Sequence, residues 1–152
     1  MSRKIKLVEL DLVTHCHATE DPEKVKKAIL NVLPPELRSA VNVSEVVLEG
    51  YYGNPIIRMG VVLRGEDAEK AFKYVIRSLS EGDRGYLLLS LEQRYDRKSN
   101  KLYLRLDKQE AYLGRLVLND GSDTIRISAS FSIVRSLDEV RKYIEEILRE
   151  SS

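Results

Sequence analysis

The sequence has one cysteine, no tryptophan and no long apolar run. Because Cys16 stands alone, an internal disulfide is excluded and a reducing compartment is the simplest expectation. The longest nearly apolar run, residues 86–91, is far below the roughly 18 residues of a membrane span. Near the amino terminus, Glu9 and Asp11 interrupt what would be the apolar part of a signal peptide. These absences predict a cytoplasmic protein that does not enter a membrane.

Groups for catalysis are also scarce. His15 and His17 lie two apart on a predicted strand, within reach of a single metal ion that Glu9 or Asp11 could complete. The chain has no other histidine and Cys16 points to the opposite face, so a zinc site would lack its usual ligands. No serine or cysteine stands in a recognisable nucleophile motif. We therefore expect a protein that is not an enzyme and has no metal or cofactor, and a metal-dependent hydrolase is kept as a lesser alternative.

The length and charge of the chain bound its organisation. A chain of 152 residues fits one domain, which we place at residues 1–152. Charged residues make up 32% of the chain, above the usual value of about 25%, but the formal net charge is only +1. Nucleic-acid binding through bulk charge is therefore not expected, and any such binding would need a local basic patch.

Two kinds of periodicity alternate along the chain. Strand-like alternation or an excess of β-branched residues predicts strands, and helical spacing of apolar residues predicts amphipathic helices. The predicted strands are residues 8–18, 43–48, 56–63, 101–106, 113–118 and 124–133, and the predicted helices are residues 22–33, 66–79, 87–91 and 136–148. Asp21 before Pro22 is a typical helix start, and Ser136 with Glu139 forms a capping-box pattern.

Grouped strands favour an α+β fold with a mainly antiparallel sheet, its helices packed on one face. The other face of the sheet would then be open. Alternation assigns these side chains of the first and last strands to the core: Val8, Leu10, Leu12, Cys16 and Ala18, and Ile125, Ile127, Ala129, Phe131 and Ile133. Periodicity alone does not give the order in which the strands pair.

A basic stripe coincides with one of these strands. Alternation in residues 101–106 points three leucines to the core and leaves Lys101, Tyr103 and Arg105 on the other face. Lys108 and Arg115 follow closely, so positive charge is concentrated in this stretch. A solvated outer face explains the pattern on the residues alone. The functional interpretation is that the four basic side chains contact phosphates while Tyr103 stacks on bases.

A glycine-rich loop, residues 49–55, joins two predicted strands. It matches neither the P-loop nor the dinucleotide fingerprint, each of which joins a strand to a helix, so a turn is the simpler interpretation. Its two aromatic residues, Tyr51 and Tyr52, are further candidates for stacking on unpaired bases.

Three blocks together resemble a known family. They are His-Ala-Thr-Glu-Asp at residues 17–21, Glu-Gly-Tyr-Tyr-Gly-Asn-Pro-Ile at 49–56, and Leu-Tyr-Leu-Arg-Leu-Asp-Lys-Gln at 102–109 with Ala-Tyr at 111–112 and glycine at 114. This combination is similar to the archaeal RNA-binding family described as a predicted exosome-associated subunit. The resemblance covers residues 7–131. It departs from the family at Leu106, where an aromatic is common, and in the helix at residues 136–150, which looks like a C-terminal extension.

The resemblance implies a fold like that of ribosomal protein L-five. It also implies a non-catalytic protein that binds structured RNA during RNA processing, decay with the exosome, or ribosome assembly, so that exosome or ribosomal components are expected partners. The alternative is a protein-interaction or assembly subunit without RNA contact, in which the helix at residues 136–148 or an exposed strand edge recruits a partner. A homodimer formed through that helix also stays open.

Overall fold

The computed structural model describes residues 5–50 and 53–150. The strands in that part of the chain are β1 (Leu7–Cys16), β2 (Ser44–Glu49), β3 (Pro55–Arg64), β4 (Tyr95–Asp96), β5 (Lys101–Asp107) and β6 (Thr124–Phe131). They form one sheet in the order β2-β3-β1-β6-β5-β4, and every neighbouring pair is antiparallel.

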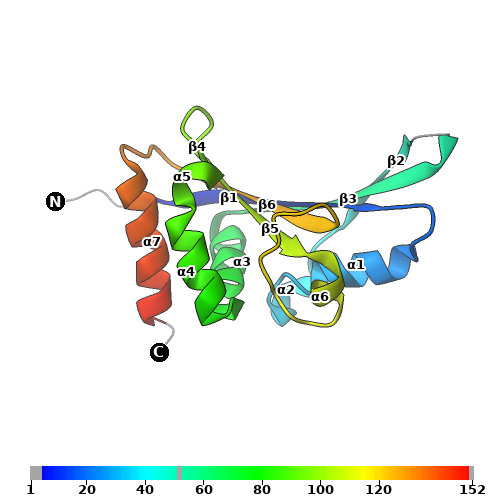
Figure 1. The fold of residues 1–152 in the computed structure, drawn as a ribbon, viewed down its shortest axis with the longest axis horizontal. Helices are drawn as coiled ribbons and strands as arrows, with labels where there is room; N and C mark the ends of the chain where they lie inside the picture. Colours follow the sequence, from blue (N-terminus) through cyan, green and yellow to red (C-terminus); the bar gives the residue numbers. More distant parts are fainter. Residues whose placement is uncertain (1–4, 51–52, 151–152) are drawn as a thin grey trace.

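The helices of the described residues are α1 (Pro22–Leu30), α2 (Pro35–Arg38), α3 (Gly65–Ser78), α4 (Glu81–Leu89), α5 (Leu91–Arg94), α6 (Lys108–Tyr112) and α7 (Leu137–Glu150). Figure 1 shows these helices gathered on one side of the sheet. The predicted α+β fold, with an antiparallel sheet and helices on one face, is therefore confirmed. The finer likeness to ribosomal protein L-five stays a prediction.

The core lies between the sheet and its helices, and strand alternation supplies it. Leu102, Leu104 and Leu106 of β5 are fully buried, as are Ile125 and Ile127 of the neighbouring β6. Helix α3 packs on β1 and β3, and its apolar stripe is buried. Strands β1, β3, β5 and β6 therefore each bury one face in the core, which leaves their alternate side chains on the face that no helix covers.

Capping side chains fix where two of the helices begin. The Asp21 carboxylate accepts a hydrogen bond from the Glu23 backbone N–H at 3.0 Å, and Pro22 supplies the first helical position, as the sequence predicts. Asp107 does the same for α6, where its carboxylate accepts from the Glu110 backbone N–H at 2.9 Å. Strand β5 therefore ends directly in a helix.

The prediction of a strand at residues 113–118 is wrong. Helix α6 occupies Lys108–Tyr112, and Gly114 then turns the chain with a φ of 88°. The following segment contributes one isolated bridge, between Leu106 and Leu118, and no strand. A helix of five residues is too short for its periodicity to be recognised, so the capping by Asp107 was the available signal.

Three of the predicted core residues of the first and last strands are exposed, so these three predictions are wrong. Between Leu7 and Glu9 the pairing of β1 with β6 shifts register, and this bulge leaves Val8 46% exposed. Ala18 and Ile133 lie beyond the ends of their strands and are exposed. The remaining core assignments of the first and last strands are confirmed by burial.

The C-terminal helix α7 belongs to the core. Val140, Ile144 and Ile147 are buried, and the helix packs against α3 and α5. Its apolar stripe is therefore covered within the chain, and the recruitment of a partner by this helix stays a prediction. Among the described residues, no helix has the length and apolar character needed to cross a membrane.

Candidate nucleic-acid interface

The uncovered face of the sheet carries a group of arginines from three strands. Cross-strand partners share a face, so the pairing of Arg105 with Arg126, of Arg126 with Val13, and of His15 with Arg58 places these side chains together. Arg58, Arg105 and Arg126 are all exposed, and we call them the arginine cluster. Sheet spacings put the Cα atoms of Arg58 and Arg126 roughly 12 Å apart, within reach of two long side chains.

Arg105 of β5 lies directly opposite Arg126 of β6. Like charges in this position repel each other and destabilise a strand pair unless something compensates them. Within residues 5–50 and 53–150, no member of the arginine cluster makes an ion pair or a side-chain hydrogen bond. The positive charge on this face is therefore available to an external anion.

His15 reports the electrostatic potential beside the cluster. Partial burial of its imidazole lowers the pKa below the usual 6.5, and the positive charges of Arg58, His17, Lys108 and Arg126 lower the pKa further. The ring is therefore mainly neutral at pH 7. An approaching phosphate would oppose these charges and favour the protonated imidazole.

Three of the predicted residues lie together on β5. Lys101 and Tyr103 are partly exposed and Arg105 is exposed. Their partners on β6 are Ser130 opposite Lys101 and Ser128 opposite Tyr103. Tyr103 therefore lies between two cations of its own strand and has no bulky residue directly opposite it on β6, an arrangement that suits a stacking platform.

The same face also carries carboxylates. Glu9 of β1 pairs with Arg64 of β3, with Nε and Oε1 3.1 Å apart, and Asp11 lies one step along the strand towards the cluster. Positive charge therefore dominates only where β3, β6 and β5 bring the arginine cluster together, and Arg64 is set apart from it by its own ion pair.

Lys108 is not available to a phosphate, which corrects its predicted role. The side chain is 3% exposed, and its Nζ donates to the His15 backbone oxygen at 2.8 Å and to Glu20 Oε1 at 2.9 Å. A third contact joins Nζ to Asp123 Oδ1 at 2.9 Å. Lys108 therefore ties the end of β1 to α6 and to the segment before β6.

The titration of Asp123 is consistent with this internal role. Burial raises the pKa of its carboxyl, but hydrogen bonds from Lys108 and Gln109 outweigh that effect and hold the pKa below its usual value. The first and third family blocks, residues 17–21 and 102–109, thus meet at the Lys108 contacts. Their combination has a structural explanation.

Arg115 lies apart from the sheet face. It follows α6, and its Nε contacts Glu110 Oε2 at 2.7 Å. Its predicted place on a strand is therefore wrong, because no strand forms at residues 113–118. Tyr51 and Tyr52 lie outside the described residues, so their predicted stacking role stays a prediction.

Sequence reasoning missed Arg58 and Arg126 as members of the site. Alternation within β3 and β6 already placed both on the side away from the core, so half of the signal was present. The missing half was the strand order, which brings β6 between β1 and β5.

The histidine pair does not extend into a metal site in this geometry. Within the described part of the chain, no group of three His, Cys, Asp or Glu side chains is arranged to hold a metal ion. Cys16 is buried at 2% exposure between His15 and His17, as expected for a small core residue. The described residues therefore do not supply the metal ligands that the alternative of a metal-dependent hydrolase requires.

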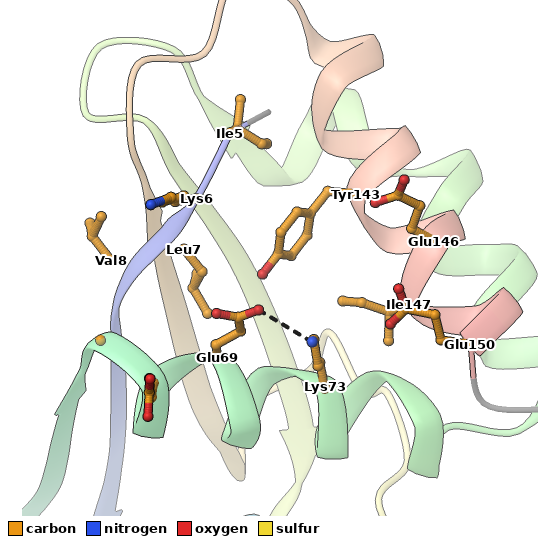
Figure 2. A pocket seen from close by; sticks show the side chains of 12 residues that line it. Ile5, Lys6, Leu7, Val8, Glu69, Lys73, Tyr143, Glu146, Ile147 and Glu150 are labelled. Carbon is orange, nitrogen blue, oxygen red and sulfur yellow. Dashed lines mark ion pairs between the residues drawn. The ribbon is translucent and has the colours of Figure 1, made fainter. Parts of the chain in front are cut away.

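A pocket of about 620 Å³ lies on the helix side, between the start of β1, α3 and α7. Figure 2 shows Glu69, Glu146 and Glu150 around it, with Glu69 paired to Lys73 at 3.2 Å. The Tyr143 ring reaches into this space from α7, and its hydroxyl is buried without a hydrogen-bond partner. This acidic lining does not suit a polyanion, so the pocket is separate from the arginine cluster in both place and charge.

Comparisons with known proteins bear on the family and fold of the chain. A family model described as RNA binding matches residues 9–131. The chain is 36% identical over 129 residues to RNA-binding protein PAB1135 of Pyrococcus abyssi, covering 84% of this chain and 83% of that protein. It is 35% identical over 135 residues to an uncharacterized protein of Methanocaldococcus jannaschii, covering 88% and 91%. The crystal structure of protein AF2318 from Archaeglobus fulgidus has a TM-score of 0.77 at 30% identity, covering 93% of this chain and 99% of that one.

Proposed function

The chain belongs to the family described as RNA binding, whose model spans residues 9–131, and we propose that it binds RNA through the uncovered face of its sheet. Membership also confirms the resemblance seen in the three sequence blocks at the level of the family. In this proposal the side chains of Lys101 and of the arginine cluster contact phosphates, and the ring of Tyr103 stacks on a base.

The observation that carries this proposal is the arrangement of Arg105 opposite Arg126. Two uncompensated cations at adjacent positions of a sheet lower its stability unless an anion binds between them. A chain of phosphates supplies such anions at regular spacing, and arginine binds each one through a planar fork of donors. The low net charge of +1 fits this local mode of binding, because attraction is then confined to one face.

Structured RNA with unpaired bases suits the face best. The arginine cluster holds the backbone without regard to sequence, and Tyr103 offers a ring on which an unstacked base can lie. A role for the protein in RNA processing, decay with the exosome or ribosome assembly is supported only by the family resemblance of its sequence blocks. The protein acts in this proposal by binding and not by catalysis.

Binding to a structured RNA with single-stranded loops, followed by fluorescence anisotropy across a range of salt concentrations, tests the proposal. We expect the double variant Arg105→Gln with Arg126→Gln to lower affinity by about tenfold or more and to flatten the dependence on salt by about one phosphate per arginine. The matched control is Arg64→Gln together with Arg115→Gln, which also removes two exposed cations, both of them ion-paired.

Equal losses in the two double variants would contradict the assignment of the cluster and indicate a general charge effect. Unchanged affinity and salt dependence in Arg105→Gln with Arg126→Gln would remove the proposed face altogether. Tyr103→Phe, which keeps a ring, is expected to retain affinity. Tyr103→Ala is expected to lose about five- to one-hundredfold if a base stacks there.

A further inference from the structure

Strand β2 (Ser44–Glu49) forms one edge of the sheet. It pairs with β3 on one side only, and all six of its residues are exposed. Figure 1 shows the β2–β3 hairpin extending past α1, away from the layer of helices. The backbone groups on the outer side of β2 thus have no strand to pair with in the described molecule, and unpaired edges of this kind are templates for another strand.

Several of the usual protections of an edge strand are missing from β2, although Glu45 and Glu49 supply negative charge near its two ends. It contains no lysine and no proline, and it pairs with β3 from Ser44 to Glu49 without a shift in register. Its centre is apolar on both faces, with Val46 49%, Val47 70% and Leu48 40% exposed. A regular, apolar and open edge is suited to adding a strand.

We propose that β2 pairs with β2 of a second copy of this chain, antiparallel and about a two-fold axis perpendicular to the sheet. This axis joins two sheets edge to edge and keeps the uncovered faces of both copies on the same side. In such a pair, residues directly opposite each other point to the same face of the joined sheet. The two-fold axis therefore passes beside one residue of β2, which lies opposite its own copy, and not between two residues.

Charge selects among the possible centres. A centre at Val47 sets Glu45 opposite Glu49 of the second copy, and a centre at Glu45 sets that carboxylate opposite itself. A centre at Val46 avoids both conflicts, because Ser44 then meets Leu48 of the second copy and Glu45 meets Val47. A centre at Leu48 keeps the carboxylates apart but engages only three residues of the strand. Like charges directly opposite destabilise a strand pair, so the register centred on Val46 is the one we assign.

This compatibility of β2 with its own reversed copy is the reason for choosing a second copy as the partner. The register centred on Val46 joins the backbones of five strand residues and sets two exposed valines side by side. It also places Arg58, the neighbour of Val46 on β3, at about 14 Å from its counterpart across the axis, three strand spacings away. The inference does not rest on RNA binding, although it would set two arginine clusters on one continuous surface.

Cysteine crosslinking tests the register directly, in the absence of RNA. In Val46→Cys the two thiols face each other across the axis at a Cα separation of about 4.5 to 5.5 Å, which a disulfide can span. We expect this variant to form a covalent dimer on mild oxidation. Val62→Cys, equally exposed at 48% but on β3 and away from the free edge, is the matched control and should not form one. Val47→Cys should also remain uncoupled, because Val47 meets Glu45.

A charge variant gives a second measurement that does not depend on thiols. Analytical ultracentrifugation of the unmodified chain should show concentration-dependent dimers, and Val46→Lys should weaken association at least tenfold while Val62→Lys leaves it unchanged. Circular dichroism establishes that each variant is folded. Efficient crosslinking through Val47→Cys but not Val46→Cys would overturn the assigned register.

The self-association itself would be overturned if the chain stayed monomeric at all concentrations up to about 1 mM. A dissociation constant of about 1 mM corresponds to a binding free energy of only about −4 kcal/mol. Equal crosslinking of Val46→Cys and Val62→Cys would also overturn the self-association, because this would reflect random collision. If Val46→Lys instead abolishes capture of a different protein while the chain alone stays monomeric, the edge serves another partner and the proposal of a second copy is wrong. Each of these outcomes is independent of RNA affinity, so it is distinguishable from a failure of the proposed function.

Discussion

Arg105 lies opposite Arg126 across the β5–β6 pair, on the face of the sheet that carries no helix. Their neighbours on the same face are Tyr103 and Ser128 on one side and Asp107 and Thr124 on the other. The Asp107 carboxylate is engaged by the start of α6 and by Asn119. Neither arginine therefore has an ion-pair partner among the described residues. Removing one of the two cations should then affect RNA binding without lowering the stability of the fold.

We expect Arg126→Ser to leave the free energy of unfolding unchanged or to raise it by about 0.5 kcal/mol, because it removes a like-charge cross-strand pair. The same substitution should weaken RNA binding. Urea denaturation and anisotropy on one preparation measure both quantities. A loss of stability above about 1 kcal/mol would show that Arg126 packs usefully in the free protein, against the account given for the pair.

The pKa of His15 should rise when RNA binds. Partial burial and then the charges of Arg58, His17, Lys108 and Arg126 lower this pKa in the free protein, and phosphates at the arginine cluster would offset those charges. NMR titration of the ring with and without RNA measures the change. Affinity should accordingly increase as the pH falls from 7.5 towards 6, and His15→Gln should lose that increase. A pKa that does not respond to RNA would place the phosphates elsewhere.

The lowered pKa of His15 should also affect the free energy of unfolding in the absence of RNA. Its folded pKa is lowered below 6.5, so the unfolded chain takes up a proton at higher pH than the native chain. The free energy of unfolding should thus be fully retained above pH 6.5 and fall as the pH drops from 6.5 through the folded pKa. Urea denaturation at a series of pH values, compared with His15→Gln, isolates this contribution.

Lys108→Met should destabilise the protein by about 3 kcal/mol, because it removes a buried ammonium and leaves its carboxylate partners uncompensated. Lys73→Met is the matched control, since Lys73 forms a partly exposed pair with Glu69 one helical turn away and should cost only about 0.5 kcal/mol. Thermal or urea unfolding measures both. Folded Lys108→Met should keep the RNA affinity and salt dependence of the original chain. A loss of binding in the folded variant would return Lys108 to the interface.

Tyr143→Phe should raise the free energy of unfolding by about 1 kcal/mol, because the Tyr143 hydroxyl is buried without a hydrogen-bond partner. Burial, together with Glu69 and Glu150, raises the pKa of this hydroxyl, so it stays neutral. The ring contacts with Phe72 and Phe131, at centroid distances of 6.1 and 5.3 Å, would be retained. Tyr74→Phe is the control, since the Tyr74 hydroxyl accepts a hydrogen bond from Arg38 at 3.3 Å. Equal effects of the two substitutions would contradict this account.

Local sequence patterns predicted most of the strands and helices, and the predictions failed at particular places in the chain. Alternation identified the core faces of β5 and β6 because a side-chain period of two is a property of the strand itself. It failed at residues 113–118, where a left-handed Gly114 turns the chain just after helix α6 and no strand forms. It also failed at Val8, because a bulge depends on how β1 meets β6.

The sequence by itself determined which side chains avoid the core, since apolar periodicity and helix caps act between residues a few positions apart. It therefore placed Lys101, Tyr103 and Arg105 on one strand face, and Arg58 and Arg126 away from the core. Only the tertiary structure decided that Arg126 meets Arg105 and that Lys108 is enclosed by Glu20 and Asp123. These contacts join segments distant in the chain, and strand order and register arise from packing of the whole sheet against its helices.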